Sequence, residues 1–158
     1  MKISFKKITL SKHQISVSEN GDLLLQASLD SFTYFLHDIV HFCVESELNV
    51  KDGFWGLVGQ GYNLDQISGK ENELTLSLRF TEQIVGPVQS IFNGHMPAGL
   101  FQETMEQIGF SCDHFHFLDE VLFRIEHIIN EWKFLPIGEC LELEFNTTEE
   151  PSLILQNF

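Results

Sequence analysis

Basic residues are few in this sequence, and the shortage limits its partners. Nine lysines and arginines stand against 23 aspartates and glutamates, which gives a formal net charge of −14 at pH 7. A surface with this charge repels the phosphates of nucleic acids and the anionic headgroups of membranes. We therefore expect neither nucleic acid nor a membrane as a partner, whereas metal ions, cationic ligands and basic proteins are compatible with the charge.

Cysteine is also sparse, and long apolar runs are missing. Cys43, Cys112 and Cys140 lie far apart without a C-x-x-C spacing, which argues against a disulfide framework and against a structural zinc knuckle. No stretch approaches the roughly 20 apolar residues of a membrane-spanning helix, and residues 1–7 lack the apolar core of a signal peptide. The sequence predicts a soluble, cytoplasmic protein.

Phenylalanine, in contrast, is abundant. Fifteen of the 158 residues are Phe and 43% are hydrophobic, and no Pro-, Gly- or Ser-rich break separates one part of the chain from another. This predicts a single domain over residues 1–158, with the tail 147–158 left unassigned. The charged fraction of 20% is low for a solvated surface, so exposed apolar area could join copies into a homo-oligomer or bind a partner protein.

Short segments with a period of two predict β-strands. Within the first 27 residues the alternating apolar pairs are Ile3 and Phe5, Ile8 and Leu10, Ile15 and Val17, and Leu23 and Leu25. The dipeptide Asn20-Gly21 lies between two of these segments and indicates a hairpin. The same alternation predicts a middle strand over residues 74–80 and a C-terminal strand over residues 140–145.

Helical spacing predicts the remaining elements. Asp30 or Ser31 caps a helix over residues 31–48, and the glycine-rich segment 53–61 predicts a short helix or turn that packs closely on its neighbour. Further helices are expected over residues 81–92 with a kink at Gly86-Pro87, 97–109 and 112–133. Together these elements predict an α+β fold, an antiparallel sheet with about four helices packed on one face.

The predicted helix 31–48 carries a narrow polar stripe on an otherwise apolar surface. At about 100° per residue, five polar side chains fall within an arc of roughly 100°: Tyr34, His37, Asp38, His41 and Glu45. No lysine or arginine accompanies them, although solvated helix faces usually carry basic partners at i,i+4 spacing. We infer that the stripe faces something other than bulk water.

Three residues of the stripe, His37, His41 and Glu45, are spaced to share one divalent metal ion. Their four-residue spacing projects all three from one helix face, and two histidines with a carboxylate suit zinc or iron. Asp38 is either a further ligand or, with Tyr34, an orienting residue that bonds the second imidazole nitrogen. The accompanying reaction would be metal-assisted hydrolysis.

The alternative is a non-catalytic interaction or dimerisation domain in which the same residues form a structural hydrogen-bond network.

A second polar cluster lies on the predicted helix 112–133. Three residues fall within about 40° on its helical wheel: His116, Glu120 and His127. Asp113-x-x-His116 repeats the spacing of Asp38-x-x-His41, and paired carboxylate-x-x-His helices hold di-metal sites in helical bundles. A site shared between the two helices is therefore a second hypothesis, although Arg124 in the same stripe favours a surface salt bridge.

One segment of the chain reads His37-Asp38-Ile39-Val40-His41-Phe42-x-Val44-Glu45 and is followed by Gly53-Phe54-Trp55-Gly56. It resembles the H-D-x-x-H-[FY]-x-V-E…G-F-[FW]-G signature of a family of small, functionally uncharacterised bacterial proteins. A second segment, Trp132-x-x-Leu135-Pro136-x-Gly138, is similar to the usual close of that family. Leu36 stands where the family has proline. The resemblance implies a bacterial, cytoplasmic protein and favours the polar stripe as its site, but it implies no particular activity.

Overall fold

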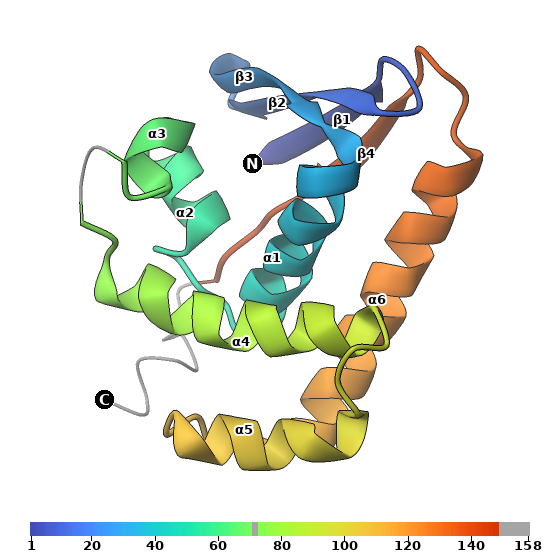
Figure 1. The fold of residues 1–158 in the computed structure, drawn as a ribbon. Helices are drawn as coiled ribbons and strands as arrows, with labels where there is room; N and C mark the ends of the chain where they lie inside the picture. Colours follow the sequence, from blue (N-terminus) through green and yellow to red (C-terminus); the bar gives the residue numbers. More distant parts are fainter. Residues whose placement is uncertain (71–72, 149–158) are drawn as a thin grey trace.

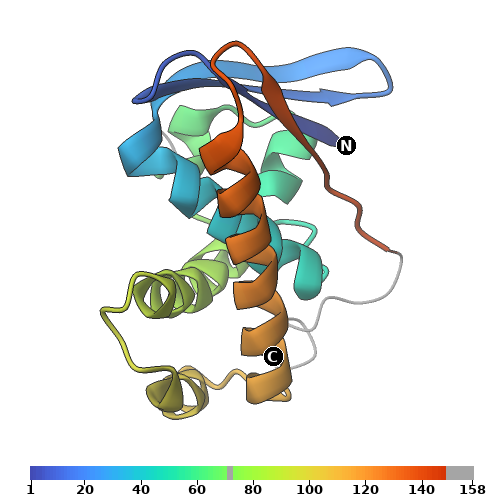
Figure 2. The same ribbon diagram turned by 90° about the vertical axis from the view of Figure 1, so that its right-hand side faces the viewer.

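A four-stranded antiparallel sheet and a group of helices form the two parts of the fold. The computed structural model describes residues 1–70 and 73–148, and the sheet order is β3-β2-β1-β4. All helices lie on one side of the sheet, and α5 (Phe101–Gln107) lies farthest from it (Figures 1 and 2). The predicted α+β fold is confirmed, with six α-helices in the described residues rather than about four.

The sheet follows from alternating apolar residues near both ends of the chain. Its strands are β1 (Lys2–Lys7), β2 (Lys12–Glu19), β3 (Asp22–Asp30) and β4 (Cys140–Glu144). Phe5 of β1 pairs with Ile15 of β2 and with Leu141 of β4. All three side chains are buried, and they meet on the face of the sheet that the helices cover. The predicted Asn20-Gly21 hairpin is confirmed, and both residues have positive φ, 51° and 91°.

One N-terminal segment is not a strand, contrary to our prediction. Ile8 and Leu10 lie in the turn between β1 and β2 and are 41% and 75% exposed. Thr9 builds this turn, because its hydroxyl oxygen accepts hydrogen bonds from the backbone N–H groups of Ser11 and Lys12. The apolar alternation of Ile8 and Leu10 therefore has no sheet partner.

Helix α1 (Leu36–Glu47) is the central element of the helical part. It begins after a π-helical turn, η1 (Ser31–Phe35), which Asp30 caps by accepting a hydrogen bond from the Thr33 N–H at 2.9 Å. All eight residues from 38 to 45 are buried, and α1 contacts α2 (Phe54–Gly59), α4 (Leu76–Phe92) and α6 (His114–Phe134). A helix covered on all sides explains why its polar stripe has no basic partners.

The predicted middle strand over residues 74–80 is wrong, because α4 begins there. Thr75 caps the helix by accepting a hydrogen bond from the Leu78 N–H at 3.1 Å, and Leu76 is 79% exposed. The buried residues recur at helical spacing over the whole segment: Ser77, Leu78, Phe80, Thr81, Ile84, Val85 and Val88. This longer period overrides the short alternation, and α4 runs unbroken through Pro87.

The other predicted helices are confirmed with small shifts in their ends. Segment 53–61 contains α2, and residues 97–109 contain the 3-10 turn η2 (Ala98–Leu100) and α5 (Phe101–Gln107). A helical turn not predicted, α3 (Leu64–Ile67), interrupts the polar loop after α2. Of the unassigned tail 147–158, residues 149–158 lie outside the described residues.

Lys7 of β1 joins the sheet to the end of α6. It is 6% exposed, and its Nζ donates hydrogen bonds to the Trp132 and Leu135 carbonyls at 2.7 and 2.8 Å. Both carbonyls lie at the C-terminus of the helix, where carbonyl groups lack the usual helical partner four residues ahead.

Among the described residues, no helix has both the length and the apolar content needed to cross a bilayer.

Candidate metal centre

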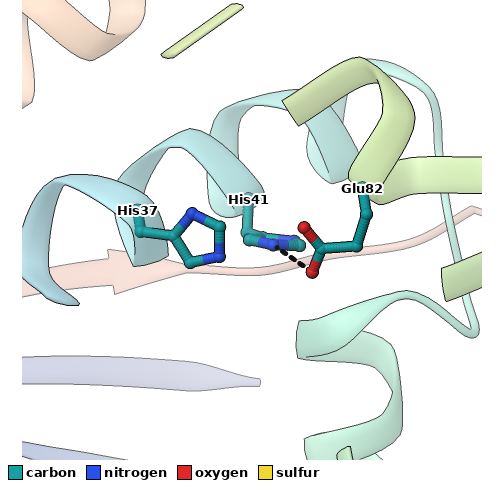
Figure 3. A group of neighbouring side chains, drawn as sticks. All are labelled: His37, His41 and Glu82. Carbon is teal, nitrogen blue, oxygen red and sulfur yellow. Dashed lines mark ion pairs between the residues drawn. The ribbon is translucent and has the colours of Figure 1, made fainter. Parts of the chain in front are cut away.

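Two histidines of α1 and one glutamate of α4 converge at the centre of the helical part. One ligand atom each from His37, His41 and Glu82 lies within 4.8 Å of the other two. The His41 Nε2 is 3.0 Å from the Glu82 Oε1, and the two imidazole rings meet edge to face with centroids 4.7 Å apart. Figure 3 shows both rings on one side of α1, with Glu82 reaching toward them from α4.

Glu45 forms a hydrogen bond with the His41 ring nitrogen that does not face Glu82. Its Oε1 lies 2.9 Å from the His41 Nδ1, and the carboxylate also accepts hydrogen bonds from the Phe54 N–H at 2.7 Å and the Trp55 N–H at 2.9 Å. These two amides are the first of α2, so the carboxylate caps that helix. Gly53 makes this possible, since a Cβ there would lie 2.5 to 2.8 Å from the Glu45 carboxylate atoms.

The second nitrogen of each imidazole is left to face the cluster. His37 Nδ1 lies 3.0 Å from the Gln89 Oε1 and His41 Nδ1 faces Glu45, so both Nδ1 atoms act as donors and each Nε2 is the nitrogen left for a metal ion, which binds the deprotonated form. The buried His41 Nε2 contacts Glu82 as an ion-pair neighbour but has no aligned hydrogen bond among the described residues. In metalloproteins, an oxygen that accepts from one imidazole nitrogen, as Gln89 and Glu45 do here, orients the other nitrogen toward the metal ion.

The carboxylates around His41 determine its protonation when no metal is bound. Burial lowers the pKa of His41, but Glu45 and Glu82 outweigh this effect and raise it to about 9. For Glu82, burial raises the pKa, but His41 and His37 favour the carboxylate more strongly and the net shift is downward. A protonated His41 between two carboxylates is therefore the metal-free state of the cluster near neutral pH.

A pocket of about 480 Å³ lies next to the cluster. His37, Asp38 and Glu82 line one part of it, and the remaining walls come from β3, η1, α2, α3 and the residues after α3: Leu29, Tyr34, Phe54, Leu64, Asp65, Ile67, Ser68 and Lys70. Asp38 is 5% exposed, and its Oδ2 has no hydrogen-bond partner among the described residues. Burial raises the pKa of Asp38 to about 7, against the opposing charge of His41.

The structure brings together most of the predicted stripe, but in different roles. His37 and His41 lie as a pair, whereas the Glu45 oxygens already bind His41 and two backbone amides. Glu45 thus occupies the orienting position that the sequence suggested for Asp38. Asp38 and Tyr34 line the pocket instead, with Tyr34 46% exposed at its wall.

Two residues of the site were not predicted. Glu82 and Gln89 are seven residues apart on α4 and so share one helix face toward α1. Both residues lie in the predicted helix 81–92, but nothing in the local sequence indicates which face of that helix packs on α1.

The second predicted cluster is not assembled. His116, Glu120 and His127 are all exposed on α6, and within residues 1–70 and 73–148 they do not form a group of ligand atoms close enough to share an ion. Arg124 pairs with Glu47 of α1 at 3.2 Å instead.

Comparisons with protein-family models, with curated proteins and with solved structures found no match to this chain. The resemblance to a bacterial family with an H-D-x-x-H signature therefore stays a prediction. The geometry of the side chains is the basis for any functional assignment.

Proposed function

We propose that this protein binds one divalent transition-metal ion, Zn²⁺ or Fe²⁺, through His37, His41 and Glu82. The observation that carries the proposal is the orientation of the two imidazoles. Each Nδ1 faces a fixed acceptor, Glu45 or Gln89, so each Nε2 is the nitrogen available beside the Glu82 carboxylate, and a metal ion would displace the proton that His41 carries there in the metal-free state.

The spacing of these atoms fits one ion with small side-chain adjustments. Metal–nitrogen and metal–oxygen bonds of about 2.0–2.2 Å separate neighbouring ligand atoms by roughly 3 Å. The His41–Glu82 pair is already 3.0 Å apart, and the three ligand atoms lie within 4.8 Å. Two histidines and one carboxylate are a donor set common to zinc hydrolases and to non-haem iron enzymes.

An ion with three protein ligands retains a position for water or substrate. The cluster residues His37 and Glu82 line the adjacent pocket, so that open position is adjacent to a space of about 480 Å³. A metal-bound water in such a site becomes acidic enough to act as a nucleophile near neutral pH. Metal-assisted hydrolysis of a small molecule is therefore the reaction class that we propose.

One observation favours a second candidate, a non-catalytic interaction domain. In the metal-free state His41 forms ion pairs with Glu45 and Glu82 at 2.9 and 3.0 Å, and these carboxylates balance the charge of the imidazolium without a metal. Five large apolar side chains in the described residues are also more than 70% exposed and could contact a partner: Leu10, Phe32, Leu76, Phe123 and Phe134. In this alternative the stripe only stabilises the central helix.

Metal titration of untagged protein distinguishes the two candidates. We expect calorimetry with Zn²⁺, and with Fe²⁺ under anaerobic conditions, to show one site per chain for the wild type. His37→Ala and Glu82→Gln should each weaken binding by more than tenfold, because each removes one of three ligands. His127→Ala removes an exposed histidine outside the cluster and serves as the matched control.

Unchanged metal affinity in both cluster variants would overturn the metal proposal. So would the absence of stoichiometric binding by a folded wild-type protein, and the structural network would then be the better account. Equal losses in the cluster variants and in His127→Ala would point to nonspecific binding by histidines.

A further inference from the structure

Asp38 is a buried carboxyl group that forms no ion pair with a side chain of the described residues. It lies on α1 at the wall of the pocket, is 5% exposed, and has an Oδ2 without a hydrogen-bond partner among the described residues. Leaving such a group unpaired costs free energy, so buried carboxylates in native proteins are generally bound by donors. Asp38 is also one of the residues that line the pocket, so a ligand there can donate to its carboxylate.

The other charged groups of the pocket are already paired. Asp65 forms an ion pair with Lys70 at 3.0 Å, and Glu82 forms one with His41 at 3.0 Å. Lys70 is therefore paired with Asp65 and does not supply a cation to Asp38 inside the pocket. With a formal net charge of −14, the protein as a whole also attracts cations rather than anions.

The rest of the pocket is mainly apolar. Leu29, Phe54, Leu64 and Ile67 form walls, and Tyr34 adds an aromatic ring. A pocket of this volume holds a small organic molecule rather than a lone inorganic ion. Its occupant should therefore combine an apolar body with a positively charged hydrogen-bond donor.

We propose that this pocket binds a small primary amine, whose ammonium group donates to the Asp38 carboxylate while its apolar body packs against Phe54, Leu64 and Ile67. This proposal goes beyond metal binding and does not depend on it, since Asp38 is not one of the three grouped ligand residues. If both proposals hold, the amine anchors a substrate next to the open position of the ion.

Binding of simple alkyl compounds to metal-free protein tests the proposal. We would titrate protein treated with a chelator with n-hexylammonium, n-hexanol and n-hexanoate at neutral pH, following the methyl resonances of Leu64 and Ile67 by NMR. The ammonium should saturate and shift these resonances. Hexanoate should bind at least tenfold more weakly, because its charge opposes that of Asp38. Shortening the chain to n-butylammonium removes two buried methylenes and should weaken binding roughly tenfold.

Asp38→Asn is the decisive variant, because it keeps the shape and removes the charge. It should weaken n-hexylammonium binding by roughly tenfold or more, as expected for loss of a charge-assisted hydrogen bond, while leaving n-hexanol binding nearly unchanged. Asp119→Asn is the control, since that carboxylate is exposed on α6 and does not line the pocket. It should change ammonium binding by less than threefold.

Three results would overturn the amine proposal: no shift of the pocket methyls, equal binding of ammonium and hexanoate, or equal losses in both aspartate variants. The ligand comparison uses the wild type, so it decides the question even if Asp38→Asn does not fold. A failure here leaves metal titration unaffected, because the amine test is done without metal. Conversely, amine binding without metal binding would leave only the metal proposal wrong.

Discussion

Glu45 shows at the scale of one residue how a single carboxylate links two parts of the site. It is fully buried and accepts hydrogen bonds from two backbone amides of α2 while facing the His41 Nδ1. The carboxylate therefore fixes both the start of α2 and the orientation of the ring that we assign to the metal. Because Glu45 is buried and its carboxylate only accepts hydrogen bonds, replacing one of its oxygens with an amide nitrogen removes an acceptor that the structure uses.

Replacing Glu45 with Gln should destabilise the protein strongly. The amide presents a donor where the carboxylate accepts, so one of the two α2 amides or His41 loses its partner, and we expect a loss of about 3 kcal/mol in the free energy of unfolding. Glu47→Gln is the control, since Glu47 is half-buried and pairs with Arg124 at 3.2 Å, and it should cost less than about 1 kcal/mol. Urea unfolding measures both, and equal losses would contradict the role given to Glu45.

His13 should make stability depend on pH independently of the metal site. It is fully buried among Phe5, Phe35 and Trp132, and burial lowers its pKa, although the charge of Asp30 opposes the shift. A folded pKa below the unfolded value of about 6.5 means that the unfolded chain takes up the proton first. The stability that His13 contributes is therefore present above about pH 6.5 and is lost as the pH falls through the folded pKa.

His13→Phe keeps an aromatic ring in this cluster and removes the titrating group. We expect the variant to lose less stability than the wild type when urea unfolding is compared between about pH 7 and about pH 5. Parallel loss in the two proteins would show that His13 is not the titrating group.

At the scale of elements, the start of α2 depends on two glycines. A Cβ on Gly53 would overlap the Glu45 carboxylate, and one on Gly56 would overlap the backbone carbonyl of Lys51. These contacts give a physical reason for the sequence pattern Gly53-Phe54-Trp55-Gly56. The pattern predicted close packing, and the structure identifies the groups that approach.

Gly53→Ala should lower the free energy of unfolding by about 1–3 kcal/mol, because the methyl group displaces Glu45. Gly86→Ala is the matched control, since Gly86 lies within α4 and a Cβ there meets nothing within 4 Å. That change should stabilise the protein by about 0.5–1 kcal/mol through better helix propensity. Thermal or urea unfolding gives both values, and destabilisation by the two substitutions alike would contradict the packing described at α2.

The elements also show where reading the sequence succeeds and where it fails. Helix α1 was predictable because its cap and apolar spacing are local, and its burial was predictable because its polar stripe lacks basic partners. Helix α4 was misread at its start, since the alternation from Leu74 to Phe80 is local whereas the helical period becomes clear only when Ile84 and Val88 are included. An apolar pattern distinguishes a helix from a strand only when it extends over more than a few residues.

For the whole molecule, the site depends on contacts that are distant in sequence. His37 and His41 were found from their spacing, but Glu82 and Gln89 reach them from another helix, as Figure 3 shows for Glu82. No local pattern specifies which face of α4 packs on α1. The sequence consequently predicted the histidines and gave the third ligand position to Glu45.

Metal binding to the folded state alone should raise the stability of the whole protein. At a Zn²⁺ concentration one hundredfold above Kd, the gain is about 2.7 kcal/mol, which corresponds to a rise in Tm of roughly 5–10 °C for a chain of this size. Differential scanning calorimetry should show this rise for the wild type and little of it for Glu82→Gln. An equal rise in both proteins would place the ion elsewhere.

The most direct test of the metal site is anomalous diffraction. Crystals of untagged protein grown with stoichiometric Zn²⁺, with data collected at the zinc absorption edge, would locate the ion without reference to activity. We predict one strong anomalous peak about 2 Å from ring nitrogens of His37 and His41 and from a Glu82 oxygen. A peak confined to surface histidines such as His116 and His127, with none between α1 and α4, would contradict the assignment.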